Sequence, residues 1–148
     1  GVGISNGLAW NADETQLYYV DSPTQCIFAF DYDLERGKIT NRRVIARIDE
    51  TEGVPDGMTI DADGKLWVAH FGGWKVSRID PETGARLSEI HVPCEQVTSC
   101  CFGGKTLNEL YITTASIGLT PEQRMVQPLA GCTFRINPGV RGTKLHKF

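Results

Sequence analysis

The 148-residue sequence lacks any apolar run long enough to cross a membrane and any cluster of positive charge. A spanning helix needs about 20 consecutive apolar residues, and no segment here approaches that length. The longest basic run is the pair Arg42 and Arg43, and the net charge is −3. We therefore expect neither a nucleic acid nor a membrane as partner. The first residues also lack the charged and apolar regions of a signal peptide.

The sequence has no Asn-x-Ser/Thr glycosylation site, and its cysteines number five, which is odd. Both features favour a reducing compartment with free thiols, and we expect a cytoplasmic protein. Cys100 and Cys101 are adjacent in an apolar segment, so they would face opposite sides of a strand. We interpret both as small buried residues. Cys94 and Cys100 do not have the paired, closely spaced ligands of a zinc site.

What is present is a globular composition, with 41% hydrophobic and 22% charged residues. Almost every apolar segment is short and is bounded by Gly, Asp, Asn or Pro, which is typical of strands. Nine such strands are predicted, in "LYYVDS", "CIFAFDYD", "RRVIARID", "KLWVAH", "KVSRID", "LSEIHV", "TSCCF", "ELYITT" and "CTFRIN". Only "TPEQRM" predicts a helix, with Thr120 as its cap, Pro121 in its first turn and Gln123 completing a capping box. The fold class is all-β.

The strands also repeat along the chain. "NGLAWNADETQLYYVDS", "DGMTIDADGKLWVAHF" and "TSCCFGGKTLNELYITTA" each contain a strand, a polar turn and a second strand with Leu before an aromatic residue. The leucine recurs as Leu17, Leu66 and Leu110. Repeats of 40 to 50 residues with about four strands each are typical of β-propeller blades.

We expect three units, at about residues 5–50, 54–93 and 96–148. A propeller typically has at least four blades, so three are too few to close one. We therefore expect residues 1–148 to be the C-terminal half of a single propeller domain; pairing with three blades of a second chain is the alternative. An isolated half would expose strand edges and an apolar face, so we expect it to self-associate.

Asn6 and Asp56 are the candidate site residues. They precede a glycine at corresponding places in the first two units, and the innermost strands of propeller blades converge on the central channel. Amide and carboxylate oxygens suit a hard divalent cation such as calcium. The alternative is that Asn and Asp merely precede glycine in tight turns. The third unit has Thr98 there, a poor ligand, so a further carboxylate would be needed.

Other candidates are weaker. "DADGK" has its glycine at the wrong position for an EF-hand and is interpreted as a hairpin turn. The three histidines, His70, His91 and His146, are isolated and interpreted as ordinary surface or sheet residues.

Two aromatic residues, Phe71 and Trp74, lie beside two glycines, and we expect them near the channel mouth or between blades. Trp10 and Trp67 are predicted to be core residues.

Several long motifs together resemble the regucalcin/gluconolactonase family, especially its animal members. These are "SNGLAW", "FDYDLERGKITNRR", "PDGMTIDADGKLWVA", "RIDPETGARL" and "VTSCCFGG". The resemblance runs from Gly3 to about Gly142. It implies the second half of a six-bladed β-propeller of about twice this length. It also implies a cytosolic protein that hydrolyses sugar lactones with one divalent cation; calcium is the first expectation, and zinc or magnesium the others.

By this resemblance, Asn6 matches the family's asparagine ligand. Asp56 matches its aspartate ligand, which is also thought to be the general base. The family's glutamate ligand and its sugar-binding Arg and Asn belong to the first half, so no substrate-binding residue is identified here. The alternatives to a lactonase are a non-enzymatic propeller that binds calcium or a protein, and a catalytically incomplete piece of the enzyme.

Overall fold

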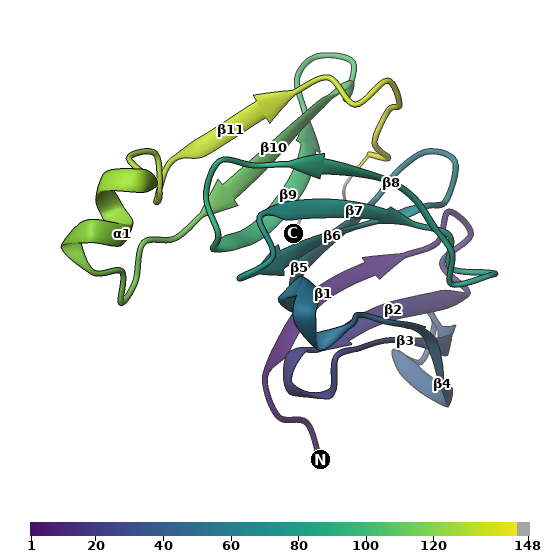
Figure 1. The fold of residues 1–148 in the computed structure, drawn as a ribbon. Coiled ribbons are helices and arrows are strands. Elements are labelled where there is room, and N and C mark those ends of the chain that lie inside the picture. The colour runs from purple at the N-terminus through teal and green to yellow at the C-terminus, as the bar shows by residue number, and fades with distance from the viewer. Residues whose placement is uncertain (145–148) are drawn as a thin grey trace.

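The computed structural model describes residues 1–144, and the chain folds into three antiparallel sheets that follow one another in sequence (Figure 1). Their strand orders are β1-β2-β3-β4, β5-β6-β7-β8 and β11-β10-β9. His146, one of the histidines considered above, lies outside the described residues. The strands are Ser5–Trp10 (β1), Gln16–Asp21 (β2), Cys26–Asp33 (β3), Lys38–Arg47 (β4), Val54–Ile60 (β5), Leu66–Phe71 (β6), Lys75–Ile79 (β7), Arg86–His91 (β8), Val97–Gly103 (β9), Glu109–Thr114 (β10) and Thr133–Ile136 (β11).

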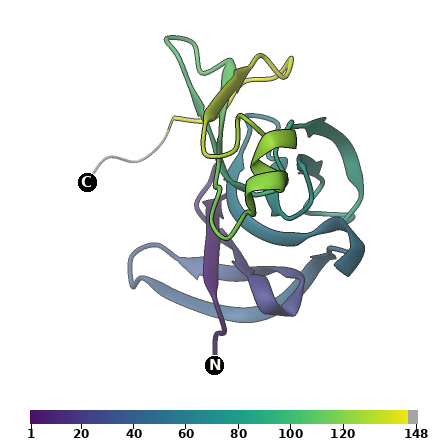
Figure 2. The same cartoon turned by 60° about the vertical axis from the view of Figure 1, so that its left-hand side comes forward.

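Three short helices accompany the strands in the described part of the chain. They are Ser22–Thr24 (η1), Glu50–Glu52 (η2) and Pro121–Val126 (α1). The predicted capping box of α1 is confirmed, because Thr120 accepts from the backbone of Gln123 while the Gln123 side chain accepts from the backbone of Thr120. The helix α1 lies on the connection between β10 and β11, at the left of Figure 1, and the turned view of Figure 2 brings it to the front. Among the described residues, no helix is long and apolar enough to span a membrane.

The all-β prediction is confirmed, and all nine predicted strands are present. The repeated leucines lie at equivalent places in the three sheets. Leu17, Leu66 and Leu110 each lie in the second strand of a sheet, and each is buried. Leu66 belongs to the core between the first two sheets and Leu110 to the core between the second and third, whereas Leu17 belongs to neither of these cores.

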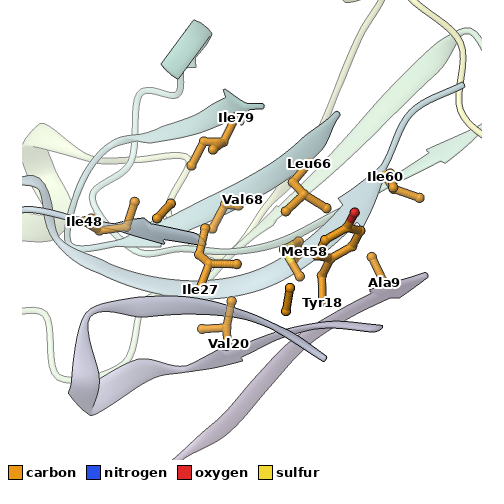
Figure 3. Packing of buried hydrophobic residues seen from close by; sticks show 12 residues of the cluster. Ala9, Tyr18, Val20, Ile27, Ile48, Met58, Ile60, Leu66, Val68 and Ile79 are labelled. Carbon is orange, nitrogen blue, oxygen red and sulfur yellow. The ribbon is translucent and has the colours of Figure 1, made fainter. Parts of the chain in front are cut away.

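The first strands of the three sheets lie side by side. Each of β1, β5 and β9 is an edge of its own sheet; β1 packs beside β5, and β5 beside β9. One apolar core fills the space between the first two sheets, and another lies between the second and third. In the first core, Val20 and Ile27 face Met58 and Val68 across the interface (Figure 3).

Two predictions about the core need correction. Trp67 is buried as expected, but Trp10 is only half-buried, with its ring edge-on to Tyr32 at 6.0 Å between centroids. Cys100 is buried and its Sγ lies 3.3 Å from the Trp67 carbonyl oxygen, whereas Cys101 is exposed. The two thiols face opposite sides of β9, and no described sheet covers the Cys101 side. All five cysteines are unpaired.

Candidate metal centre

Each of the three first strands is interrupted by a β-bulge, which adds one residue that its partner strand does not match. In β1 the bulge falls between Ser5 and Leu8, and in β5 between Pro55 and Met58. In β9 the extra residue is Thr98. The irregularity thus occurs at equivalent places in all three sheets, near the start of the strand.

The two candidate ligands are the residues that these bulges carry. Asn6 with Gly7, and Asp56 with Gly57, occupy the unmatched positions of β1 and β5. Both pairs lie inside strands, so the interpretation as tight-turn residues is wrong. A bulge rotates a side chain out of the regular alternation of a strand, and such bulges often adjoin functional sites.

Close packing of the first strands explains the glycine after each candidate ligand. A Cβ atom at Gly7 would lie 2.7 Å from the backbone nitrogen of Met58 and 2.9 Å from the carbonyl oxygen of Asp56. A Cβ atom at Gly57 would lie 2.7 Å from the Cα of Ser99. Real Cβ atoms do not come this close to backbone atoms. Glycine therefore lets the bulges of adjacent sheets touch, which brings Asn6 beside the bulge that carries Asp56.

A buried serine links the same two bulges. Asn6 Nδ2 donates to Ser22 Oγ at 2.9 Å, and Ser22 Oγ donates to the Pro55 carbonyl oxygen at 2.6 Å. Ser22 is 5% exposed and begins η1, directly after β2. Sequence reasoning missed this residue, because its two partners lie 16 and 33 positions away in the chain.

Asp56 is a partly buried carboxylate that forms no ion pair with any residue in the described part of the chain. Burial raises its pKa to about 6, and the backbone N–H of Gly57 offsets only part of that rise. Among the described residues, no cationic side chain acts to lower this pKa. Burying a negative charge is costly unless a cation compensates it. The environment of Asp56 therefore fits a bound cation.

The oxygen donors on this chain are too few to complete such a site. Among the described residues, no group of three or more His, Cys, Asp or Glu side chains could hold a metal ion. The third bulge supplies no replacement, because Thr98 Oγ1 lies 2.8 Å from Thr113 Oγ1 and forms a hydrogen bond with it. The residues present fit a divalent cation as two of its ligands, one an amide oxygen and one a carboxylate.

The two aromatic candidates lie at the same end of the second sheet as Asp56. Phe71 ends β6 and pairs with Val54, two residues before Asp56. Trp74 follows in the β6–β7 turn with a left-handed backbone (φ 60°), and its side chain is 39% exposed. Their involvement at a channel mouth stays a prediction.

The two histidines in the described part of the chain, His70 and His91, are sheet residues. His70 is fully buried in β6, and its Nδ1 lies 3.0 Å from the Glu52 carbonyl oxygen. Burial lowers the pKa of His70, so the neutral ring is favoured. His91 is exposed on β8 beside Glu89. Neither belongs to the group formed by Asn6, Asp56 and Ser22.

Comparison with known proteins decides the family. Residues 1–116, which include both candidate ligands and the first two sheets, match the family model described as the SMP-30/Gluconolactonase/LRE-like region. The chain belongs to this family. The three sheets are accordingly blades of a β-propeller, of which the chain forms a part.

Individual members of the SMP-30/gluconolactonase family resemble this chain in both sequence and structure. Regucalcin of Danio rerio is 51% identical over 142 residues, which cover 95% of this chain and 48% of that protein. The crystal structure of a calcium-binding protein, regucalcin from Agrobacterium tumefaciens, superposes with a TM-score of 0.90 at 28% identity, covering 96% of this chain and 48% of that one. A gluconolactonase from Xanthomonas campestris gives a TM-score of 0.64 at 32% identity, over 76% and 35% of the two chains. The chain spans about half the length of the curated relatives it matches.

Proposed function

We propose that this chain supplies two ligands, Asn6 and Asp56, to a divalent-cation site that hydrolyses sugar lactones. The observation that carries the proposal is the contact between two bulges, one holding an amide and the other a carboxylate that lacks a cationic partner. Membership of a family named for gluconolactonase, and a 32% identical gluconolactonase among the solved structures, support this choice of reaction.

The role of each residue follows from its chemistry. A bound divalent cation supplies polarisation of the lactone carbonyl and stabilisation of the oxyanion that develops there. The Asp56 carboxylate holds the cation and takes the proton of the attacking water as general base. Asn6 holds the cation through a neutral oxygen, so it fixes the position without adding charge.

We propose calcium as the cation, with zinc or magnesium as alternatives. Carboxylate and amide oxygens are hard ligands that suit calcium and magnesium more than the sulfur- and nitrogen-preferring metals. One structural relative is described as a calcium-binding protein. A third protein ligand has to come from outside the described residues, or be replaced by water.

Replacing Asp56 by alanine tests the proposal. In the protein expressed from its complete coding sequence, Asp56→Ala should abolish gluconolactone hydrolysis and weaken calcium binding, because it removes both a ligand and the base. The readouts are the rate of acid release from gluconolactone and calcium titration calorimetry. Wild-type turnover by this variant would show that Asp56 has neither role.

An exposed carboxylate of the same sheet provides the control. Asp63 lies in the turn between β5 and β6, at the far end of the hairpin from Asp56, and pairs with Arg78. Asp63→Ala should keep both activity and calcium affinity. The second candidate function is calcium binding without catalysis, which is favoured because the Agrobacterium relative is a calcium-binding protein. It would be supported if the wild-type protein binds calcium through Asp56 but hydrolyses no lactone.

A further inference from the structure

Ser22 is placed where it can control the orientation of Asn6. Its hydroxyl is buried and lies between two groups, the Asn6 side-chain amide at 2.9 Å and the Pro55 carbonyl oxygen at 2.6 Å. Its own backbone is fixed, because Ser22 N donates to the Ile4 carbonyl oxygen at 3.1 Å. The serine therefore touches the strand that carries Asn6 and the residue that precedes Asp56.

The chemistry of the three groups sets the direction of both hydrogen bonds. A carbonyl oxygen can only accept, and a serine hydroxyl has a single hydrogen to donate. Because that hydrogen goes to Pro55, the hydroxyl can only accept on its other side. Asn6 must therefore turn its NH2 group toward Ser22, which leaves Oδ1 as the opposite end of the amide. Asn6 Oδ1 accepts no hydrogen bond from the described residues.

We propose that Ser22 is a positioning residue of the metal centre, which holds Asn6 with Oδ1 presented to the cation and ties this ligand to the bulge of Asp56. The inference rests on the proposed function of Asn6 and Asp56 as ligands. A freely rotating amide would present its NH2 group, which repels a cation, as readily as its oxygen. Hydrogen-bond partners that orient a metal ligand typically affect metal affinity by about 10- to 100-fold when removed.

Calcium titration of serine variants tests the inference, in the protein expressed from its complete coding sequence. Ser22→Ala removes the hydroxyl and should raise the calcium Kd by about 10- to 100-fold. Ser22→Thr keeps a hydroxyl and should restore most of the affinity. Ser77→Ala is the matched control: Ser77 is fully buried in β7, its Oγ has no described partner, and it should leave the Kd unchanged.

The outcomes separate this inference from the proposed function. If wild type binds none of calcium, zinc and magnesium, or Asp56→Ala binds the cation as tightly as wild type, both are wrong. If Asp56→Ala loses calcium while Ser22→Ala keeps wild-type affinity, only the role of Ser22 is wrong. An equal loss of affinity in Ser22→Ala and Ser77→Ala would show a general effect of lost packing and would also overturn it.

A measurement on the unmutated protein covers the case in which Ser22→Ala does not fold. By NMR, one of the two Asn6 side-chain amide protons should exchange slowly, because it is held by the buried Ser22 hydroxyl. The Asn6 side-chain carbonyl carbon should shift when calcium is added, because Oδ1 becomes a ligand. Fast exchange of both protons, or an unmoved carbonyl carbon, would contradict the inference.

Discussion

At the scale of single residues, the candidate metal centre combines two oxygen-bearing residues, each followed directly by a glycine. Asn6 and Asp56 offer oxygen atoms, while Gly7 and Gly57 offer no side chain at all. The glycines matter because a Cβ atom at either position would lie less than 3 Å from the backbone of the neighbouring first strand. Gly7 therefore gives the space in which the bulges of Asn6 and Asp56 meet, and Gly57 gives β5 the same space against β9.

Gly57→Ala tests this role of glycine. The added methyl group would collide with Ser99 of β9, including its backbone, so the bulge has to shift. We expect the free energy of unfolding to fall by about 1 to 3 kcal/mol, as for other overpacked interiors, and calcium affinity to fall with it. Urea denaturation and calcium titration measure the two effects.

Gly1→Ala is the control for this substitution, since a Cβ atom there meets nothing within 4 Å. It should leave both the stability and the affinity unchanged. If Gly57→Ala matched it in both measurements, the close approach of β5 and β9 would not be a requirement of the site.

Residue-scale prediction from sequence reached the candidate ligands but not their support. Asn6 and Asp56 stood out because they recur at one point of a repeat, a signal that is local in sequence. Ser22 gave no such signal, since its contacts depend on how β2 returns beside β1 and β5. The exposure of Cys101 was missed for a similar reason: alternation along a strand predicts opposite faces, but not which face another sheet covers.

At the scale of elements, the second sheet is joined to the segment before it by an ion network. Glu52 of η2 accepts from Lys75 Nζ of β7 at 3.0 Å and from Arg86 of β8, and Glu89 of β8 accepts from the same Lys75 at 3.0 Å. Lys75 is 8% exposed, and its buried ammonium group is paired with both carboxylates. The network fixes η2, which leads directly into the strand that carries Asp56.

Stability should depend on pH through Glu52. Its hydrogen bond with Arg86, and then that with Lys75, lower the Glu52 pKa from 4.5 to about 2. Because the folded pKa lies below the ordinary one, this stabilisation is complete above about pH 4.5 and is lost as the pH falls toward 2. Glu52→Gln should therefore lower the free energy of unfolding at pH 7 by about 1 kcal/mol, a modest value because the carboxylate is partly screened by solvent.

Denaturation of wild type and Glu52→Gln at several pH values checks this expectation. The difference between them should be largest near pH 7 and should shrink below pH 4.5. Glu35→Gln, at an exposed position in the turn before β4, should show no comparable effect. A difference between wild type and Glu52→Gln that is constant over this pH range would contradict the assignment to charge.

The elements themselves were predictable because their signals are local. Strands were bounded by turn residues, and the helix carried its own capping box. The bulges were not predictable, since a bulge is defined by the register of two strands and no residue pattern marks it. The alternative interpretation of Asn6 and Asp56 as turn residues failed for this reason, because both lie in strands at irregular positions.

At the scale of the whole molecule, the repeat predicted several similar sheets, and the family comparison confirms that they are propeller blades. Within residues 1–144, the first two sheets have four strands and the third has three. The chain spans about half the length of its curated relatives, so any further residues of the proposed site were beyond prediction from this sequence. Self-association of an isolated half stays a prediction.

A crystal structure of the protein grown with calcium, with the ion located by its anomalous scattering, would test directly whether Asn6 and Asp56 are its ligands. We expect one ion with both Asn6 Oδ1 and an Asp56 carboxylate oxygen at about 2.3–2.6 Å, the usual range for calcium. An ion bound elsewhere, or one that leaves either residue uncoordinated, would contradict this expectation.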